Sequence, residues 1–342
     1  MKKQIIAAAV ATSVSAIAMA DVSITGNANY EYFSKEDTTN FKSNYSDTEI
    51  NLSVKGKTGD TSVVANFEID SHGGADTALD IEDTYIATKI GDFNVKAGNY
   101  ASGTTALGGE IDQGGRATDK VDINTMIGDI KVGYAVSADS NEVYNTDGAA
   151  VYASIPVAGW TVGVKDNSDS YTITGAQGSI GGFDIRVENK DNDSSTTGDA
   201  LFYNITTKVG DVTVGYAAID ADKAGTGATS DAVTEGDSAI FAQEMATDST
   251  SSGKTGVDGV SQVMASTTVD GTTFTVKVGE LRGGLSGSTQ YQDAGFSQIA
   301  AKRKLASGAT INVSYDDYES TVATGGVITD TQVFEIDLSI AF

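Results

Sequence analysis

The only histidine of the chain, His72, lies in the run Asp70-Ser71-His72-Gly73-Gly74, where an acid, a hydroxyl and an imidazole follow one another. These are the residue types of a nucleophilic triad, in which a base activates a hydroxyl and an acid orients the base. Triad side chains converge from separate elements, and neighbours within one loop rarely meet in that geometry. Catalysis by His72 is therefore a minor alternative, and the sequence predicts a protein that is not an enzyme.

Metal ligands are equally sparse. The chain has no cysteine and one histidine, which excludes a zinc site of the usual kind. The acidic runs Asp191-Asn192-Asp193 and Asp220-Ala221-Asp222 could collect calcium at loop tips, although neither has the spacing of an EF-hand loop. No glycine-rich phosphate loop opens a helix. The sequence thus predicts no cofactor, with loop-bound calcium as the one alternative.

The charge balance is strongly acidic. The chain has 47 acidic against 22 basic residues, for a net charge of −25. So negative a surface repels nucleic acid, which is not expected as a partner. Acidity also occurs in disordered chains, but here 39% of the residues are hydrophobic and they alternate regularly with polar ones. We therefore expect a folded chain.

Short turn signals recur along the whole chain. Each is a pair of small or acidic residues that tolerate positive φ, as tight hairpin turns require. The pairs are Gly59-Asp60, Gly91-Asp92, Gly128-Asp129, Ala158-Gly159, Gly181-Gly182, Gly210-Asp211, Asp270-Gly271 and Ser307-Gly308.

Between these turns the hydrophobic period is two. Ile50, Leu52 and Val54 alternate with polar residues, and the same pattern runs through residues 63–70 and 183–188. A strand with this pattern has one apolar face and one wet face. The fold class is therefore all-β, with hairpins as the repeating unit.

The hairpins are asymmetric, which argues for a membrane barrel over a soluble sandwich. The tight turns at one end contrast with long connections at the other, as in residues 34–43, 100–120 and 221–256. Outer-membrane barrels place short turns on the periplasmic side and long loops outside in this way.

Aromatic residues and proline support the same interpretation. Phe93, Trp160 and Phe183 each follow a tight turn, where an interfacial girdle of rings is expected. Pro156 is the only proline, as suits a sheet that leaves no free edge in lipid.

The first residues predict secretion. Lys2 and Lys3 precede an apolar stretch from Ile5 to Met19 that ends on Ala18-Met19-Ala20. A basic start, a short apolar run and a small-residue exit are typical of a cleaved signal peptide. We expect residues 1–20 to be the signal and residues 21–342 to form one barrel domain.

The last strand alternates down to an aromatic terminus, with Phe334, Ile336, Leu338, Ile340 and Phe342 on one face. Together with the opening run Val22-Ser-Ile-Thr-Gly-Asn-Ala-Asn-Tyr and the hairpin texture, this resembles Gram-negative outer-membrane porins of the general diffusion family. The resemblance covers the whole mature chain. It implies that Phe342 is an assembly signal read by the barrel-assembly machinery.

Eight tight turns, with an opening and a closing strand, predict an antiparallel transmembrane β-barrel of 16–18 strands. The turn count favours 18, and the least certain hairpin is the one around residues 166–170. A barrel of this size encloses an aqueous lumen. The polar positions that should line it are Lys55, Lys96, Lys131, Lys165, Arg186, Lys277, Glu68, Asp70, Asp83, Asp184, Glu188, Glu335 and Asp337.

The resemblance further implies that the third external loop folds into the pore. By its position in the chain that loop is residues 100–120, which carry Glu110 and Asp112, with Arg116 beyond them. The proline-containing sequence of enteric porins is absent there, so the match is by position and not by motif. These three residues are the expected constriction, and the alternative is that the two acids are ordinary solvated loop residues.

The functional expectation is a porin in the outer membrane of a Gram-negative bacterium, in which small hydrophilic solutes and ions diffuse passively. The acidic excess predicts a mild cation preference. Partners implied by the resemblance are outer-membrane lipid and lipopolysaccharide, the barrel-assembly machinery, and two further copies in a homotrimer. The alternatives are an extracellular adhesin or surface-layer β-solenoid, and an outer-membrane barrel enzyme.

Overall fold

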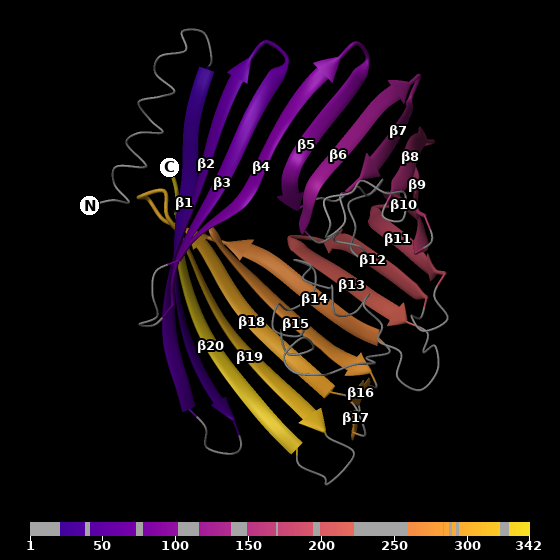
Figure 1. Cartoon of the computed structure of the whole chain (residues 1–342). Helices are drawn as coiled ribbons and strands as arrows, with labels where there is room; N and C mark the ends of the chain where they lie inside the picture. Colours follow the sequence, from indigo (N-terminus) through magenta and orange to yellow (C-terminus); the bar gives the residue numbers. More distant parts are fainter. Residues whose placement is uncertain are drawn as a thin grey trace, which may run out of the picture.

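The computed structural model describes residues 21–37, 42–72, 78–101, 116–137, 149–168, 170–193, 199–221, 259–282, 284–286, 289–291, 294–321 and 328–342. All the regular elements in these residues are β-strands (Figure 1). They are β1 (Asp21–Asp37), β2 (Lys42–Thr58), β3 (Thr61–His72), β4 (Ala78–Ile90), β5 (Phe93–Ala101), β6 (Arg116–Ile127), β7 (Ile130–Val136), β8 (Ala150–Val157), β9 (Trp160–Asn167), β10 (Tyr171–Ile180), β11 (Phe183–Asn192), β12 (Ala200–Val209), β13 (Val212–Ala221), β14 (Gly259–Val269), β15 (Thr272–Arg282), β16 (Gly284–Ser286), β17 (Thr289–Tyr291), β18 (Ala294–Lys304), β19 (Thr310–Thr321) and β20 (Ile328–Ala341). Within the same residues there is no helix long and apolar enough to cross a membrane.

The main sheet has 18 strands and closes on itself. Each strand pairs antiparallel with its neighbours along the chain, and β1 pairs with both β2 and β20, which completes the barrel. Strands β16 and β17 form a separate small hairpin between β15 and β18. The prediction of a barrel is confirmed, at the higher of the two strand numbers. Because the sheet is one closed antiparallel ring and not a stack of repeats, the β-solenoid alternative is wrong.

All eight predicted turns connect neighbouring strands of the sheet. The chain reaches positive φ at each of them, with φ of 57° at Gly59 and 62° at Gly210. Two turns place a residue other than glycine in this region, Ala158 at 51° and Asp270 at 49°. The turn residues therefore predicted the hairpins correctly, because a tight turn between two strands requires residues that adopt positive φ.

The hairpin predicted with least certainty, around residues 166–170, is present as the pair β9–β10. Strands β9 and β10 are joined by residues 168–170, where the amide of Ser170 donates to the carbonyl of Asn167 at 3.0 Å. The amide of Ser168 donates to the carbonyl of Ala149, also at 3.0 Å, and thereby ties this turn to the start of β8. Two backbone hydrogen bonds thus tie the described ends of this connection to the barrel wall.

The wall has an uneven height. Strands β1 and β2 have 17 residues each, whereas β7 has 7 and both β8 and β9 have 8. The short strands lie together on one side of the barrel, opposite the β1–β2 hairpin in the ring order (Figure 1).

Candidate functional site: the inner wall of the barrel

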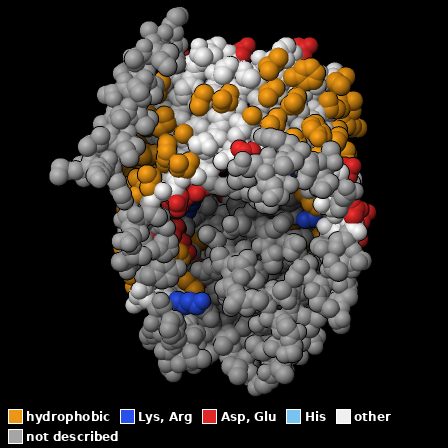
Figure 2. All heavy atoms as spheres, viewed as in Figure 1, with side chains coloured by type: hydrophobic (Ala, Val, Ile, Leu, Met, Phe, Trp, Pro, Cys, Tyr) orange, Lys and Arg blue, Asp and Glu red, His pale blue; other side chains and the backbone are white. Residues whose placement is uncertain are grey.

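The two faces of the sheet differ sharply in chemistry. Large apolar side chains such as Ile127 and Val209 are about two-thirds exposed on the outer face. Cross-strand pairs on the opposite face are polar, as between Asn51 and Glu68. In Figure 2 apolar side chains gather over the strand-covered part of the surface, while charged ones surround the hollow in the middle of the view. The alternation seen in the sequence thus divides an apolar outside from a polar lumen.

Basic residues outnumber acids on the inner face from β5 to β12. Residues that are directly opposite on paired strands point to the same face of a sheet. Lys96 is opposite Asp122, and Tyr152 is opposite Lys165. We call this set the basic arc: Lys96, Lys120, Lys131, Lys165, Arg186 and Lys190.

Lys96 is held by two aromatic rings. Its ammonium lies 3.9 Å from the ring centroid of Tyr85 and 3.8 Å from that of Tyr100. The two rings meet edge to face at 5.7 Å, and Tyr100 is only 1% exposed. The sheet is irregular here, with a bulge between Gly98 and Tyr100 that places both rings around the lysine. Cation–π contacts of this kind fix the charge against the wall.

The next part of the basic arc is also tied to tyrosines. The hydroxyl of Tyr152 donates to the carboxylate of Asp122, with distances of 3.0 and 3.1 Å to its two oxygens. Lys165 donates to the hydroxyl of Tyr171 at 3.0 Å, and the Lys190 ammonium lies 4.5 Å from the Tyr171 ring centroid. These contacts hold the charges in fixed positions along the wall.

Acids outnumber bases on the inner face from β19 through β1 to β4, which we call the acidic arc. Carboxylate oxygens of Glu31, Glu335 and Asp337 lie within 4.8 Å of one another. Further along, the amide of Asn66 donates to Asp83 at 3.0 Å. The acidic arc comprises Asp316, Glu335, Asp337, Glu31, Glu68 and Asp83, with Lys55 among them.

The structure places the predicted wall residues on one face but does not describe the predicted constriction. Lys55, Lys96, Lys131, Arg186, Glu68 and Asp83 all belong to the polar, inner face. Glu110 and Asp112 lie outside the described residues. Arg116 begins β6, but its side chain is not among those described.

Several residues of the inner wall were not predicted from the sequence. Lys120 and Lys190 complete the basic arc, and Tyr100 and Tyr152 position its charges. The signal for Lys120 was present, since it shares the alternation of residues 120–126 with Asp122. The tyrosines gave no such signal, because their partners lie on other strands.

The rival sites gain no support from the described contacts. The backbone of His72 ends β3 and pairs with Asp47 of β2, and its side chain is not described. Of the acids considered for calcium, Asp191 and Asp193 are exposed and Asp220 accepts a hydrogen bond from Tyr203 at 3.3 Å. Asp222 lies outside the described residues.

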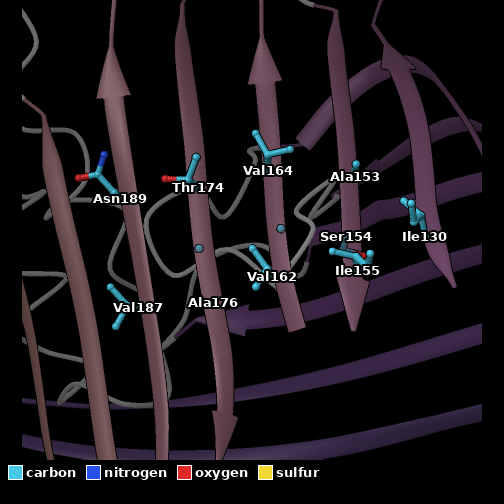
Figure 3. Close-up of a pocket in the computed structure, with 12 residues that line it drawn as sticks. Ile130, Ala153, Ser154, Ile155, Val162, Val164, Thr174, Ala176, Val187 and Asn189 are labelled. Carbon is cyan, nitrogen blue, oxygen red and sulfur yellow. The ribbon is translucent and has the colours of Figure 1, made fainter. Parts of the chain in front are cut away.

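A depression of about 500 Å³ lies on the outer wall over β7 to β11. Figure 3 shows Ile155, Val162, Val164 and Val187 around it, from neighbouring strands. Its lining carries no charged side chain. It belongs to the apolar outside and is not part of the polar lumen.

No model of a protein family matches this sequence, and no curated protein matches it. Solved structures match the fold. OccK2 (OpdF) of Pseudomonas aeruginosa in complex with glucuronate has 9% identity and a TM-score of 0.63, covering 94% of this chain and 98% of that chain. OccAB3 of Acinetobacter baumannii has 10% identity and a TM-score of 0.61, covering 94% and 100%.

A third match is OpdK of Pseudomonas aeruginosa with vanillate, at 9% identity and a TM-score of 0.58, covering 93% of this chain and 99% of that chain. At these identities the likeness concerns the fold. The general diffusion family named from the sequence is not confirmed by these matches.

Proposed function

We propose that this chain forms a water-filled channel through which small hydrophilic solutes and ions diffuse passively across the outer membrane of a Gram-negative bacterium. The observation that carries the proposal is the division of one closed sheet into an apolar outside and a charged inside. A barrel needs an apolar outside only where lipid surrounds it, and a charged inside where water fills it.

The size of the ring supports an open lumen. With strands spaced about 4.8 Å apart and tilted by about 40°, an 18-strand ring has a backbone diameter of about 36 Å. Side chains on opposite walls do not fill such a ring, in contrast to a barrel of about eight strands. Loops that enter the lumen would then set its narrowest point, and Glu110, Asp112 and Arg116 remain the proposed constriction.

The separated arcs suggest how charged solutes travel. Anions would follow the basic arc and cations the acidic arc, across a field directed from one wall to the other. The matched barrels include one solved with glucuronate and one with vanillate, both small carboxylates. The chain as a whole is acidic, and we retain a mild cation preference as part of the proposal.

The remaining proposals concern biogenesis and partners. We propose that residues 1–20 are a cleaved signal, that Phe342 guides assembly by the barrel-assembly machinery, and that the barrel contacts lipopolysaccharide and forms a homotrimer. No catalytic role is assigned. Cross-linking in native membranes tests the trimer, and N-terminal sequencing of the mature protein tests cleavage before Asp21.

The channel is tested in a planar bilayer. Addition of the purified, folded protein should produce stepwise conductance in KCl, and heat-denatured protein should produce none. Proteoliposomes should swell in small sugars and amino acids at rates that fall with solute size. Absence of both conductance and swelling in a protein that is folded on an unheated gel would contradict the proposal.

A further inference from the structure

One row of inward-facing residues crosses six neighbouring strands in strict register. The pairs run from Thr161 to Gln177, from Gln177 to Arg186 and from Arg186 to Asn204. They continue from Asn204 to Ala217 and from Ala217 to Gln262. Adjacent members are separated by a strand spacing of about 5 Å. The row therefore forms a band around one third of the wall, from β9 to β14, in which five members are polar and one, Ala217, is apolar.

The band lies in a groove. A cavity of about 380 Å³ over β9 to β12 is lined by Gln177, Arg186, Asn204 and Thr206, among others. A second cavity of about 130 Å³ over β12 to β14 is also lined by Asn204 and Thr206. The second exists because Gly215 and Ala217 leave room between Thr206 and Met264. The two cavities share Asn204 and Thr206 and so adjoin each other along the band, and we call the pair the groove. The larger of the two has the volume of a small-molecule site.

The polar groups of the groove are available for binding. Within the described part of the chain, the side chains of Thr161, Gln177, Asn204 and Thr206 make no hydrogen bond to other protein groups. All four are partly exposed to the lumen. Two amides and two hydroxyls thus offer donors and acceptors that no other described side chain or backbone group satisfies.

The groove has one base, and its charge is compensated. Nε of Arg186 donates to the carboxylate of Glu188 at 2.8 Å, and Nη2 of Arg186 forms an ion pair with the same oxygen. Glu188 is 1% exposed and belongs with the guanidinium in the wall. The one acid in the lining, Asp184, accepts a hydrogen bond from Ser179. The groove therefore differs from the rest of the basic arc, where lysines carry the surplus charge.

We propose that this groove binds neutral polyhydroxylated solutes of monosaccharide size as they pass. Amide and hydroxyl side chains that both donate and accept match the hydroxyl groups of a sugar, and the compensated charge gives no advantage to an anion. The inference rests on the proposed channel function and names a solute class for it.

The test measures block of ion current by galactose in single channels of the full-length protein. The wild type should show current reduction that saturates with galactose concentration. The double variant Gln177→Leu with Asn204→Leu should raise the half-saturating concentration about tenfold, since each lost amide bond changes affinity by a few-fold. Thr206→Val, which removes only a hydroxyl, should raise it by about threefold.

The matched control is Asn27→Leu on β1, an inward-facing asparagine outside the groove whose amide donates to Asn29 at 3.3 Å. It should leave galactose block unchanged. Unaltered KCl conductance and gel mobility show that each variant has folded. If galactose block is equal in wild type and groove variants, the groove is not the site.

Galacturonate separates the solute classes, because it differs from galactose by a carboxylate. Block by galacturonate stronger than block by galactose, and weakened by the same groove variants, would overturn the assignment to neutral solutes. If the wild type shows no KCl conductance, the channel proposal itself fails. If it conducts but shows no saturable block by galactose, only the groove assignment fails.

Discussion

The ring of Phe342 lies directly over Gly26, and the same two residues exchange both backbone hydrogen bonds at 2.9 Å. A Cβ at position 26 would stand 2.9 Å from Cζ of this ring and would also meet the carbonyl oxygen of Asn51. Phe342 therefore extends the β1–β20 pairing that closes the barrel, and its ring occupies a site that only glycine leaves open.

Gly26→Val should prevent closure of the barrel, because a branched side chain cannot fit between Phe342 and the backbone of β2. We expect less than about a tenth of the protein to acquire the mobility of a folded barrel on an unheated gel, since the clash exceeds the usual 1–3 kcal/mol of an overpacked site. Gly56→Val is the control, because Gly56 has no neighbour within 4 Å. Normal folding of the position 26 variant would show that the close approach is not required.

Gly133 and Tyr152 form a second pair of this kind, on the inner wall. The Tyr152 ring occupies the space of a side chain at position 133. Gly133→Ala should destabilise the barrel by about 1–3 kcal/mol. Tyr152→Ser alone should also destabilise the barrel, and the loss in the double variant should be smaller than the sum of the two single losses. Thermal loss of the folded gel band measures both, and additive destabilisation in the double variant would contradict the contact.

The two arcs should have opposite effects on ion selectivity. Replacing Lys165 and Lys190 by glutamine should make the channel more cation-selective, whereas Glu335→Gln with Asp337→Asn should make it less so. A charge about 7 Å from a passing ion contributes about 0.6 kcal/mol in water, so each charge removed should change the permeability of one ion about threefold. Reversal potentials across a KCl gradient give the ratio. Shifts of the same sign for both variants would argue against separated arcs.

Replacing Ala158 by glycine should stabilise the folded barrel. Its φ of 51° lies in the left-handed region, where a side chain costs about 1 kcal/mol. Ala158→Gly should therefore raise the temperature at which the folded band is lost. The same substitution at Ala153, in the middle of a strand, should lower it, because glycine weakens a strand interior.

The sequence was sufficient to predict the hairpins and to divide the wall into an apolar and a polar face. Turn residues such as Gly59 and Gly210 act locally, and the period of two follows from strand geometry, so both features can be read without knowing the neighbours. Lys96 and Arg186 lie on the polar face of the sheet, as the alternation of their strands indicates.

What could not be predicted depends on contacts between strands. The enclosure of Lys96 needs the bulge after Gly98 and a ring from β4, and neither leaves a pattern in the local sequence. The groove from Thr161 to Gln262 depends on the register of six strands, which the turns determine only jointly. The alternation within one strand predicts which face of the sheet a residue lies on, but it does not predict which residues of the other strands lie beside it.

If the barrel spans a bilayer as proposed, the low side of its wall has a consequence for the lipid beside it. Eight residues tilted by about 40° span about 20 Å, less than the roughly 25 Å of an ordinary apolar band. The strands β8 and β9 therefore cannot match the hydrocarbon thickness that β1 and β2 match with ease. In the proposed membrane setting, the bilayer would thin beside the short strands or the barrel would lean toward them, and the membrane would be deformed on that side.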